Sequence, residues 1–169
     1  VYTIYFPVFA TLARHDKWAD VRSQLNRLLA LAGGGGALLT VVVFFNAHWI
    51  IPFVFGPQYG ASVAVLIILY VCLPVFYVSQ MGSLAADALG FERPNLIITA
   101  SAVVLNIALN LFAIPRYGPV GAAWTTVISH TYLAVLLALM AYRKLGERTR
   151  MAAAAAGTAA GTGTGTTAA

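Results

Sequence analysis

Residues 94–142 read PNLIITASAVVLNIALNLFAIPRYGPVGAAWTTVISHTYLAVLLALMAY. The single Asp, Glu, Lys or Arg residue in this segment is Arg116, which divides it into two uncharged runs, 94–115 and 117–142. A helix needs roughly 20 mostly apolar residues to cross the hydrocarbon core, and a charge at the bilayer centre costs about 2.5 to 3.5 kcal/mol. Each run therefore predicts one membrane-spanning helix, at about 95–114 and 120–142.

The first half of the chain has the same character. Residues 28–86 carry no Asp, Glu, Lys or Arg, and as one helix they would be about 88 Å long, so they must fold back. Breakers and aromatic residues between 46 and 60, such as Pro52, Gly56 and Trp49, mark the turn at a membrane interface. Two further spans are predicted, at about 28–51 and 61–82, the second kinked at Pro74.

The overall composition excludes a soluble domain. Hydrophobic residues make up 60% of the chain and charged residues 9%, against about 25% charged in soluble domains. The net charge of +5 comes from short loops, where membrane orientation explains it, so no nucleic-acid partner is expected. The lone cysteine, Cys72, excludes an internal disulfide. The fold class is all-α: a multi-spanning transmembrane helical bundle of four complete spans plus the end of a preceding helix.

Three regions follow from this pattern. Residues 1–13 read as the end of a truncated transmembrane helix whose beginning lies outside the chain. Residues 14–150 form the four-span portion; helical spacing of apolar residues from Trp18 to Ala32 predicts an interfacial helix feeding into the first span. Four glycines, 33–36, lie inside that span and would permit close helix approach or a bend. Residues 151–169, rich in Ala, Gly and Thr, are expected to be disordered.

The basic residues orient the chain. Nine of the ten Lys and Arg residues fall on one side of the predicted bundle, and Arg116 is alone on the other. Because loops rich in Lys and Arg stay in the cytoplasm, residues 14–27, 83–94 and everything after Arg143 are expected there. The turns 46–60 and 115–119 would then be extracytoplasmic, in the cell inner (plasma) membrane, with the C-terminus cytoplasmic.

Four segments carry a family resemblance in this order: FGPQYGAS (55–62), ALGFERP (88–94), NIALNL (106–111) and IPRYGPVGAA (114–123). Together they resemble the C-terminal part of polysaccharide and lipid-linked oligosaccharide flippases, within the multidrug, oligosaccharidyl-lipid and polysaccharide exporter superfamily. The resemblance covers roughly residues 1–142. It implies twelve to fourteen helices in two lobes around a cavity that opens to alternate sides, with these spans resembling the last four of a twelve-helix core. The missing N-terminal lobe would then be a partner, and it carries most of the charges that line such cavities.

Candidate site residues have two interpretations each. His130 is the ionisable residue placed deepest in a span; it could couple protons, or it is a neutral imidazole hydrogen-bonded to a neighbouring helix, which we expect because no acidic residue lies at its depth. Asn106 and Asn110 share a helical face and could line a path for sugar hydroxyls or tie helices together. Asp87 could be a gating or ion-coupling carboxylate, or a solvated charge at a helix end.

The basic residues Arg14, Lys17, Arg22 and Arg27 could contact lipid head groups, including a lipid pyrophosphate, although topology already explains them. The sequence contains no nucleophile-elbow, zinc-protease or nucleotide-binding motif. We therefore expect no catalytic residue, no metal, no cofactor and no enzymatic activity.

The expected function is that of the C-terminal portion of a transporter that flips lipid-linked oligosaccharide or polysaccharide precursors, as in polysaccharide or lipopolysaccharide biosynthesis, by alternating access. Its partners would be membrane lipids and the lipid-linked sugar. The alternatives are a multidrug or lipid-precursor exporter of the same superfamily, or a transport-incompetent membrane scaffold or gene fragment. Within the bundle, Asn106 is expected to meet Thr126, Ser129 and His130, because their depths from the turn at 115–119 match.

Overall fold

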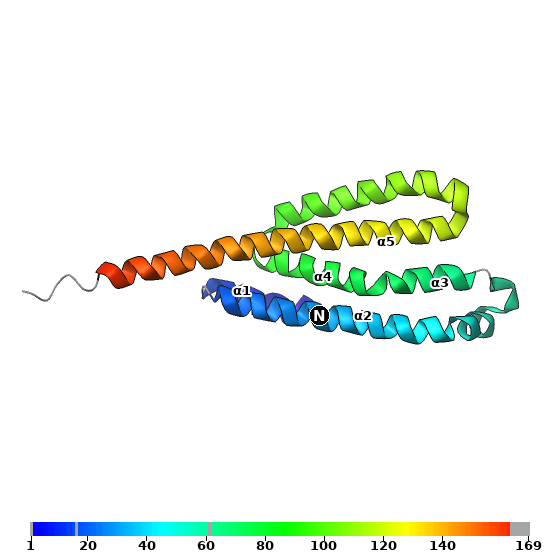
Figure 1. Ribbon diagram of the computed structural model, residues 1–169, viewed down its shortest axis with the longest axis horizontal. Coiled ribbons are helices and arrows are strands. Elements are labelled where there is room, and N and C mark those ends of the chain that lie inside the picture. Colours follow the sequence, from blue (N-terminus) through cyan, green and yellow to red (C-terminus); the bar gives the residue numbers. More distant parts are fainter. Residues whose placement is uncertain (1, 16, 61, 163–169) are drawn as a thin grey trace, which may run out of the picture.

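The computed structural model describes residues 2–15, 17–60 and 62–162, and nearly all of them are helical. The helices are α1 (Tyr2–Arg14), α2 (Trp18–Phe55), η1 (Pro57–Tyr59), α3 (Ser62–Val71), α4 (Leu73–Ala88) and α5 (Glu92–Thr162). They lie side by side along the long axis of the molecule (Figure 1). The predicted all-α class is confirmed. Asp16, expected on the basic side, Ala61, expected at the start of the second span, and the first residue and 163–169 lie outside the described residues.

Helix α2 runs without a break through the four glycines. Gly36 lies where α2 crosses α4: a Cβ atom at this position would be 2.7 Å from Pro74 Cα, so only glycine allows the two backbones this close. The expected role of the glycines in close helix approach is confirmed at this position. The helix also continues past the predicted end at Ile51 to Phe55, and breaks at Gly56, whose φ of 97° is in the region that favours glycine.

The second predicted span is a bent pair of helices. α3 and α4 meet at Cys72 with an angle of 41°, and Pro74 lies in the first turn of α4. The kink predicted at Pro74 is therefore confirmed. Proline is well accommodated there because the first residues of a helix have no intrahelical acceptor for their N–H groups.

Helix α5 is a hairpin. It comprises two helical arms between Glu92 and Thr162, which meet at Gly118; this residue, between Pro115 and Pro119, has non-helical angles (φ 58°, ψ −142°). The chain reverses here, and the two arms run antiparallel along the bundle (Figure 1). A Cβ atom on Gly121 would lie 2.6 Å from the Ala113 carbonyl oxygen, which shows how closely the arms approach beside the turn.

The structure is that of an integral membrane protein. Two helices, α2 and residues 92–151 of α5, are long and apolar enough to cross a membrane, and the α3–α4 pair is a third candidate. Large apolar side chains point outward along these helices; the exposed fraction of Phe45 is 76%. Such a surface suits lipid rather than water. The predicted number of four spans, in which each arm of α5 crosses once, stays a prediction.

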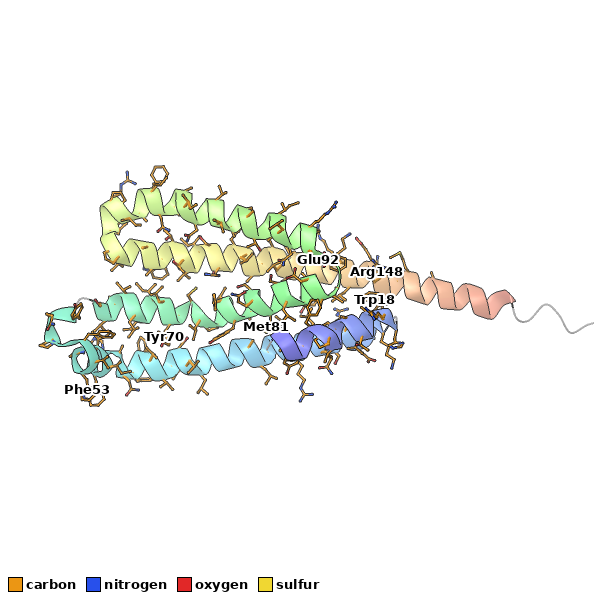
Figure 2. All side chains as sticks on the ribbon, turned by 180° about the vertical axis from the view of Figure 1, so that it is seen from behind. Trp18, Phe53, Tyr70, Met81, Glu92 and Arg148 are labelled. Atoms are coloured by element: carbon orange, nitrogen blue, oxygen red, sulfur yellow. The ribbon has the colours of Figure 1, made fainter. Side chains whose placement is uncertain are left out.

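One end of the bundle holds the larger core. Phe9 of α1, Trp18 and Leu25 of α2, Leu84 of α4 and Leu145 of α5 are all buried in it. The start of α2 is thus not an isolated interfacial helix, because its apolar face packs against α1, α4 and α5 rather than lying against lipid. Figure 2 shows Trp18, Glu92 and Arg148 at this end and Phe53 at the opposite end.

The C-terminal segment differs from its prediction. Residues 151–162 continue α5 as a helix instead of being disordered. Alanine has the highest helix propensity, and extending an existing helix avoids the cost of nucleation. This segment projects beyond the other helices (Figure 1).

Candidate functional site

A ladder of amides and hydroxyls joins the two arms of α5. Asn106 Nδ2 donates to Ser129 Oγ at 3.1 Å, and Asn110 Nδ2 donates to Asn106 Oδ1 at 3.0 Å. Thr125 Oγ1 donates to Asn110 Oδ1 at 2.6 Å. The predicted contact of Asn106 with the polar cluster of the second arm is confirmed through Ser129. The two asparagines also bond to each other, because residues four apart along a helix lie on the same face.

A polar cavity of about 350 Å³ adjoins this ladder. Three helical segments line it: α4, the first arm of α5 and the second arm of α5. Its polar lining residues are Ser79, Gln80, Ser83, Thr99, Asn106, Thr126, Ser129 and His130, with Ala102, Val103 and Leu133 completing the wall. None of these lining residues is Asp, Glu, Lys or Arg, so the cavity offers hydrogen bonds without the desolvation cost of a buried ion. Asn106 belongs to both the ladder and the cavity.

His130 lines the cavity, and its Nδ1 atom is buried and has no hydrogen-bond partner among the residues that the structure describes. The imidazole ring packs edge-on against Phe76, with 5.0 Å between ring centroids. This differs from the expected hydrogen bond to a neighbouring helix. An unpaired buried polar atom costs about 1–3 kcal/mol.

A second polar cluster lies where α4 passes into α5. Asn95 Nδ2 donates to Asp87 Oδ1 at 2.6 Å and to Ser83 Oγ at 2.8 Å, and Ser83 Oγ donates to Asn95 Oδ1 at 3.1 Å. Asn95 is 7% exposed. Asp87 lies in the last turn of α4, is partly buried and accepts a hydrogen bond from a buried amide; its role, as a coupling carboxylate or a charge at a helix end, stays a prediction. Gly90, with φ 78°, makes the reversal that sets Asp87 against Asn95.

Ser83 belongs to both the cavity and the Asp87 cluster. Polar groups therefore continue from the α4–α5 turn, through the cavity, to the ladder. We call these polar residues the polar track: those of the Asp87 cluster (Asp87, Asn95 and Ser83), those that line the cavity, and those of the ladder (Asn106, Asn110, Ser129 and Thr125). Sequence reasoning missed Ser83, Gln80 and Asn95. The sequence did contain a sign that Asn95 lies near Asp87, because a short turn containing Gly90 and Pro94 separates the two residues.

The four basic candidates for lipid contact have different surroundings. Arg14 and Lys17 are exposed at the α1–α2 junction. The Arg22 guanidinium carbon lies 5.7 Å from the centre of the Tyr142 ring, within the range of a cation–π contact. Arg27 lines a small cavity of about 200 Å³ with Tyr5 and Gln24. The structure gathers these residues at one end of the bundle but not around a common centre.

A known protein gives these features a context. Over 142 residues, 82% of this chain, the sequence is 32% identical to the probable flippase AglR of Haloferax volcanii. The predicted resemblance to flippases is confirmed. The chain spans 29% of the length of that relative. No family model and no solved structure matches the chain.

Proposed function

We propose that this chain forms part of a transporter that flips lipid-linked oligosaccharide or polysaccharide precursors outward across the cell inner (plasma) membrane. The proposal rests on the uncharged polar cavity enclosed by apolar helices, in a chain similar to a probable flippase. A sugar crossing the bilayer must exchange its hydrogen bonds with water for bonds with the protein. Hydroxyl and amide side chains such as Gln80, Thr99 and Asn106 provide both donors and acceptors for that exchange.

The arrangement of turns supports the orientation in this proposal. The break after α2 and the fold-back of α5 lie at one end of the bundle, and the starts of α2 and α5 lie at the other (Figure 1). Nine of ten basic residues belong to the second end or to the segment beyond it. In the proposed topology this end is cytoplasmic, each arm of α5 is one span, and the C-terminus is cytoplasmic.

The proposed mechanism is alternating access, in which two helical lobes rock around a site near the bilayer midplane. The partners in this mechanism are membrane lipids, the lipid-linked sugar and a further helical lobe for these helices to move against. The polar track would form part of one wall of the pathway. We assign the chain no catalytic step and no cofactor.

The experiment compares two substitutions in cells that lack the chromosomal gene. Gln80 is exposed, lines the cavity and makes no hydrogen bond with the described residues, so Gln80→Leu removes a polar group without breaking an internal bond. One lost neutral hydrogen bond predicts an about two- to tenfold slower appearance of saccharide at the outer face. Asn46→Leu is the matched control, since this exposed amide on α2 bonds only to the Val42 carbonyl oxygen of its own helix.

Equal rates for the two variants would contradict a role for the cavity. Drug sensitivity of the deletion strain with normal saccharide export would favour the alternative of a drug exporter. Normal saccharide export and normal drug sensitivity in the deletion strain would favour a membrane scaffold.

A second role, proton coupling, is favoured by one observation: His130 lines the cavity and its Nδ1 atom has no hydrogen-bond partner among the described residues. His130→Gln keeps a hydrogen-bonding side chain but cannot carry a proton at neutral pH. Transport that persists in this variant and stays independent of an imposed pH gradient assigns His130 to substrate hydrogen bonding. Loss of the gradient dependence at normal protein levels assigns it to coupling.

A further inference from the structure

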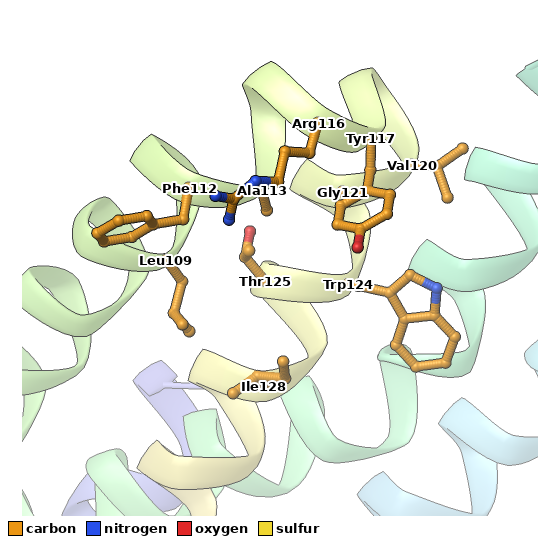
Figure 3. A pocket seen from close by; sticks show the side chains of 10 residues that line it. All are labelled: Leu109, Phe112, Ala113, Arg116, Tyr117, Val120, Gly121, Trp124, Thr125 and Ile128. Atoms are coloured by element: carbon orange, nitrogen blue, oxygen red, sulfur yellow. The ribbon is translucent and has the colours of Figure 1, made fainter.

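A larger cavity lies beside the fold-back of α5, and Thr125 of the polar track is among its lining residues. It has a volume of about 500 Å³ and shares no lining residue with the polar cavity. Figure 3 shows its side chains: Leu109 and Phe112 from the first arm, Trp124, Thr125 and Ile128 from the second, and Arg116 and Tyr117 beside the turn. Ala113 and Gly121, whose backbones approach closely beside the turn, complete the lining together with Val120.

Arg116 gives this cavity a charge that nothing in the described part of the chain balances. It is exposed and makes no hydrogen bond or ion pair with the residues that the structure describes. Within the described part of α5 the acidic residues are Glu92, at its start, and Glu147, in its second arm, and both are more than 20 residues from Arg116 in the sequence. A guanidinium pairs best with a phosphate or carboxylate, to which it donates two parallel hydrogen bonds.

The rest of the lining is suited to lipid. Phe112 is 67% exposed and Tyr117 70% exposed, and Trp124 is also exposed. Tyr and Trp are enriched where a membrane helix meets the headgroup region. From Arg116 back to Leu109 the helix rises about 10 Å, so an apolar groove leads from the guanidinium toward the bilayer interior.

We propose that this cavity holds a membrane phospholipid, with its phosphate on Arg116 and one acyl chain along Leu109, Phe112 and Ile128. The charge of the phosphate complements the lone guanidinium, and the groove beside it takes the acyl chain that a free phosphate lacks. This inference requires only that the arms of α5 lie in the membrane, so it stands apart from the proposed transport of sugars.

The test measures lipids retained by the purified full chain in detergent, by native mass spectrometry, after incubation with phosphatidylglycerol or with diacylglycerol of the same acyl chains. Wild type is expected to retain phosphatidylglycerol about tenfold better, since a charge-assisted hydrogen bond is lost with the phosphate. Arg116→Gln should lose this preference, and Arg116→Lys should keep part of it. Arg93→Gln is the matched control, an exposed arginine at the start of α5, at the opposite end of its first arm from Arg116.

A second measurement locates the acyl chain without any variant. Phosphatidylglycerol with a photoreactive group in its acyl chain should label Leu109, Phe112 or Ile128 in wild type, and millimolar inorganic phosphate should not reduce the labelling. Equal retention of the two lipids by wild type, or labelling spread over the outer face of α2, would overturn the proposal. Competition by inorganic phosphate alone would assign the site to a free anion and would overturn it as well.

Discussion

Adding one methyl group at Gly36 should push α2 and α4 apart. A Cβ atom there would be 2.7 Å from Pro74 Cα, 2.8 Å from Pro74 N and 3.1 Å from Leu73 C. All three are backbone atoms, so no side-chain rotation relieves the contact. An ordinary contact of 3.4 Å requires the backbones to separate by about 0.7 Å. The Thr40 hydroxyl, within hydrogen-bond reach of the Gly36 and Tyr70 carbonyl oxygens, would be displaced as well.

The magnitude follows from the cost of overpacking. Extra methyl groups in a packed interior typically cost about 1–3 kcal/mol, whereas a glycine replaced by alanine in an open helix gains up to about 1 kcal/mol. At Gly34 and Gly35, neighbours in the same helix, an added Cβ atom would find open space, with no atom of another helix within 4 Å. Gly36→Ala should therefore be less stable than Gly34→Ala or Gly35→Ala by about 1–4 kcal/mol.

Thermal unfolding in detergent, followed by circular dichroism, measures this difference. For a chain of this size each kcal/mol shifts the midpoint by roughly 2–4 °C, so the Gly36→Ala midpoint should lie at least roughly 2 °C below those of the two controls. Equal midpoints for all three variants would refute the close crossing of α2 and α4.

Two further predictions concern the arms of α5 and the orientation. Asn106→Leu removes the bond to Ser129, and should lower the free energy of unfolding by about 0.6–1.7 kcal/mol; unchanged stability in the same detergent assay would show that the ladder does not hold the arms together. In a cysteine-free background, Gln58→Cys should react with an impermeant thiol reagent in intact cells and Arg93→Cys only after lysis, because the turn after α2 is expected outside and the start of α5 inside. The reverse pattern would invert the topology.

The sequence was sufficient for features that depend on counting along a helix. The charge-free runs located the helices, and equal depth from a short turn placed Asn106 near Ser129. Pro74 indicated the bend between α3 and α4 because a proline cannot donate to the ladder of a continuous helix. In each case a local rule fixes a position along the helix axis.

Features that depend on rotation about the helix axis or on a neighbouring chain segment were not predictable. Which of the four glycines meets α4 depends on how α2 is rotated, and this singles out Gly36. The bond between Asp87 and Asn95 depends on the backbone angles of Gly90 in the turn between them. His130 was expected to bond across helices, but its depth alone did not show that the ring packs edge-on against Phe76 and that Nδ1 has no partner among the described residues.

The proposed movement of lipid-linked saccharide from the inner to the outer leaflet can be measured in cells. The distribution of this lipid between the leaflets is determined by treating intact and lysed cells with a glycosidase that does not cross the membrane. Deletion of the gene should shift the saccharide to the protected, cytoplasmic side, and the wild-type gene should restore its exposure. An unchanged distribution in the deletion strain, at an unchanged total amount of the lipid, would contradict the proposed transport.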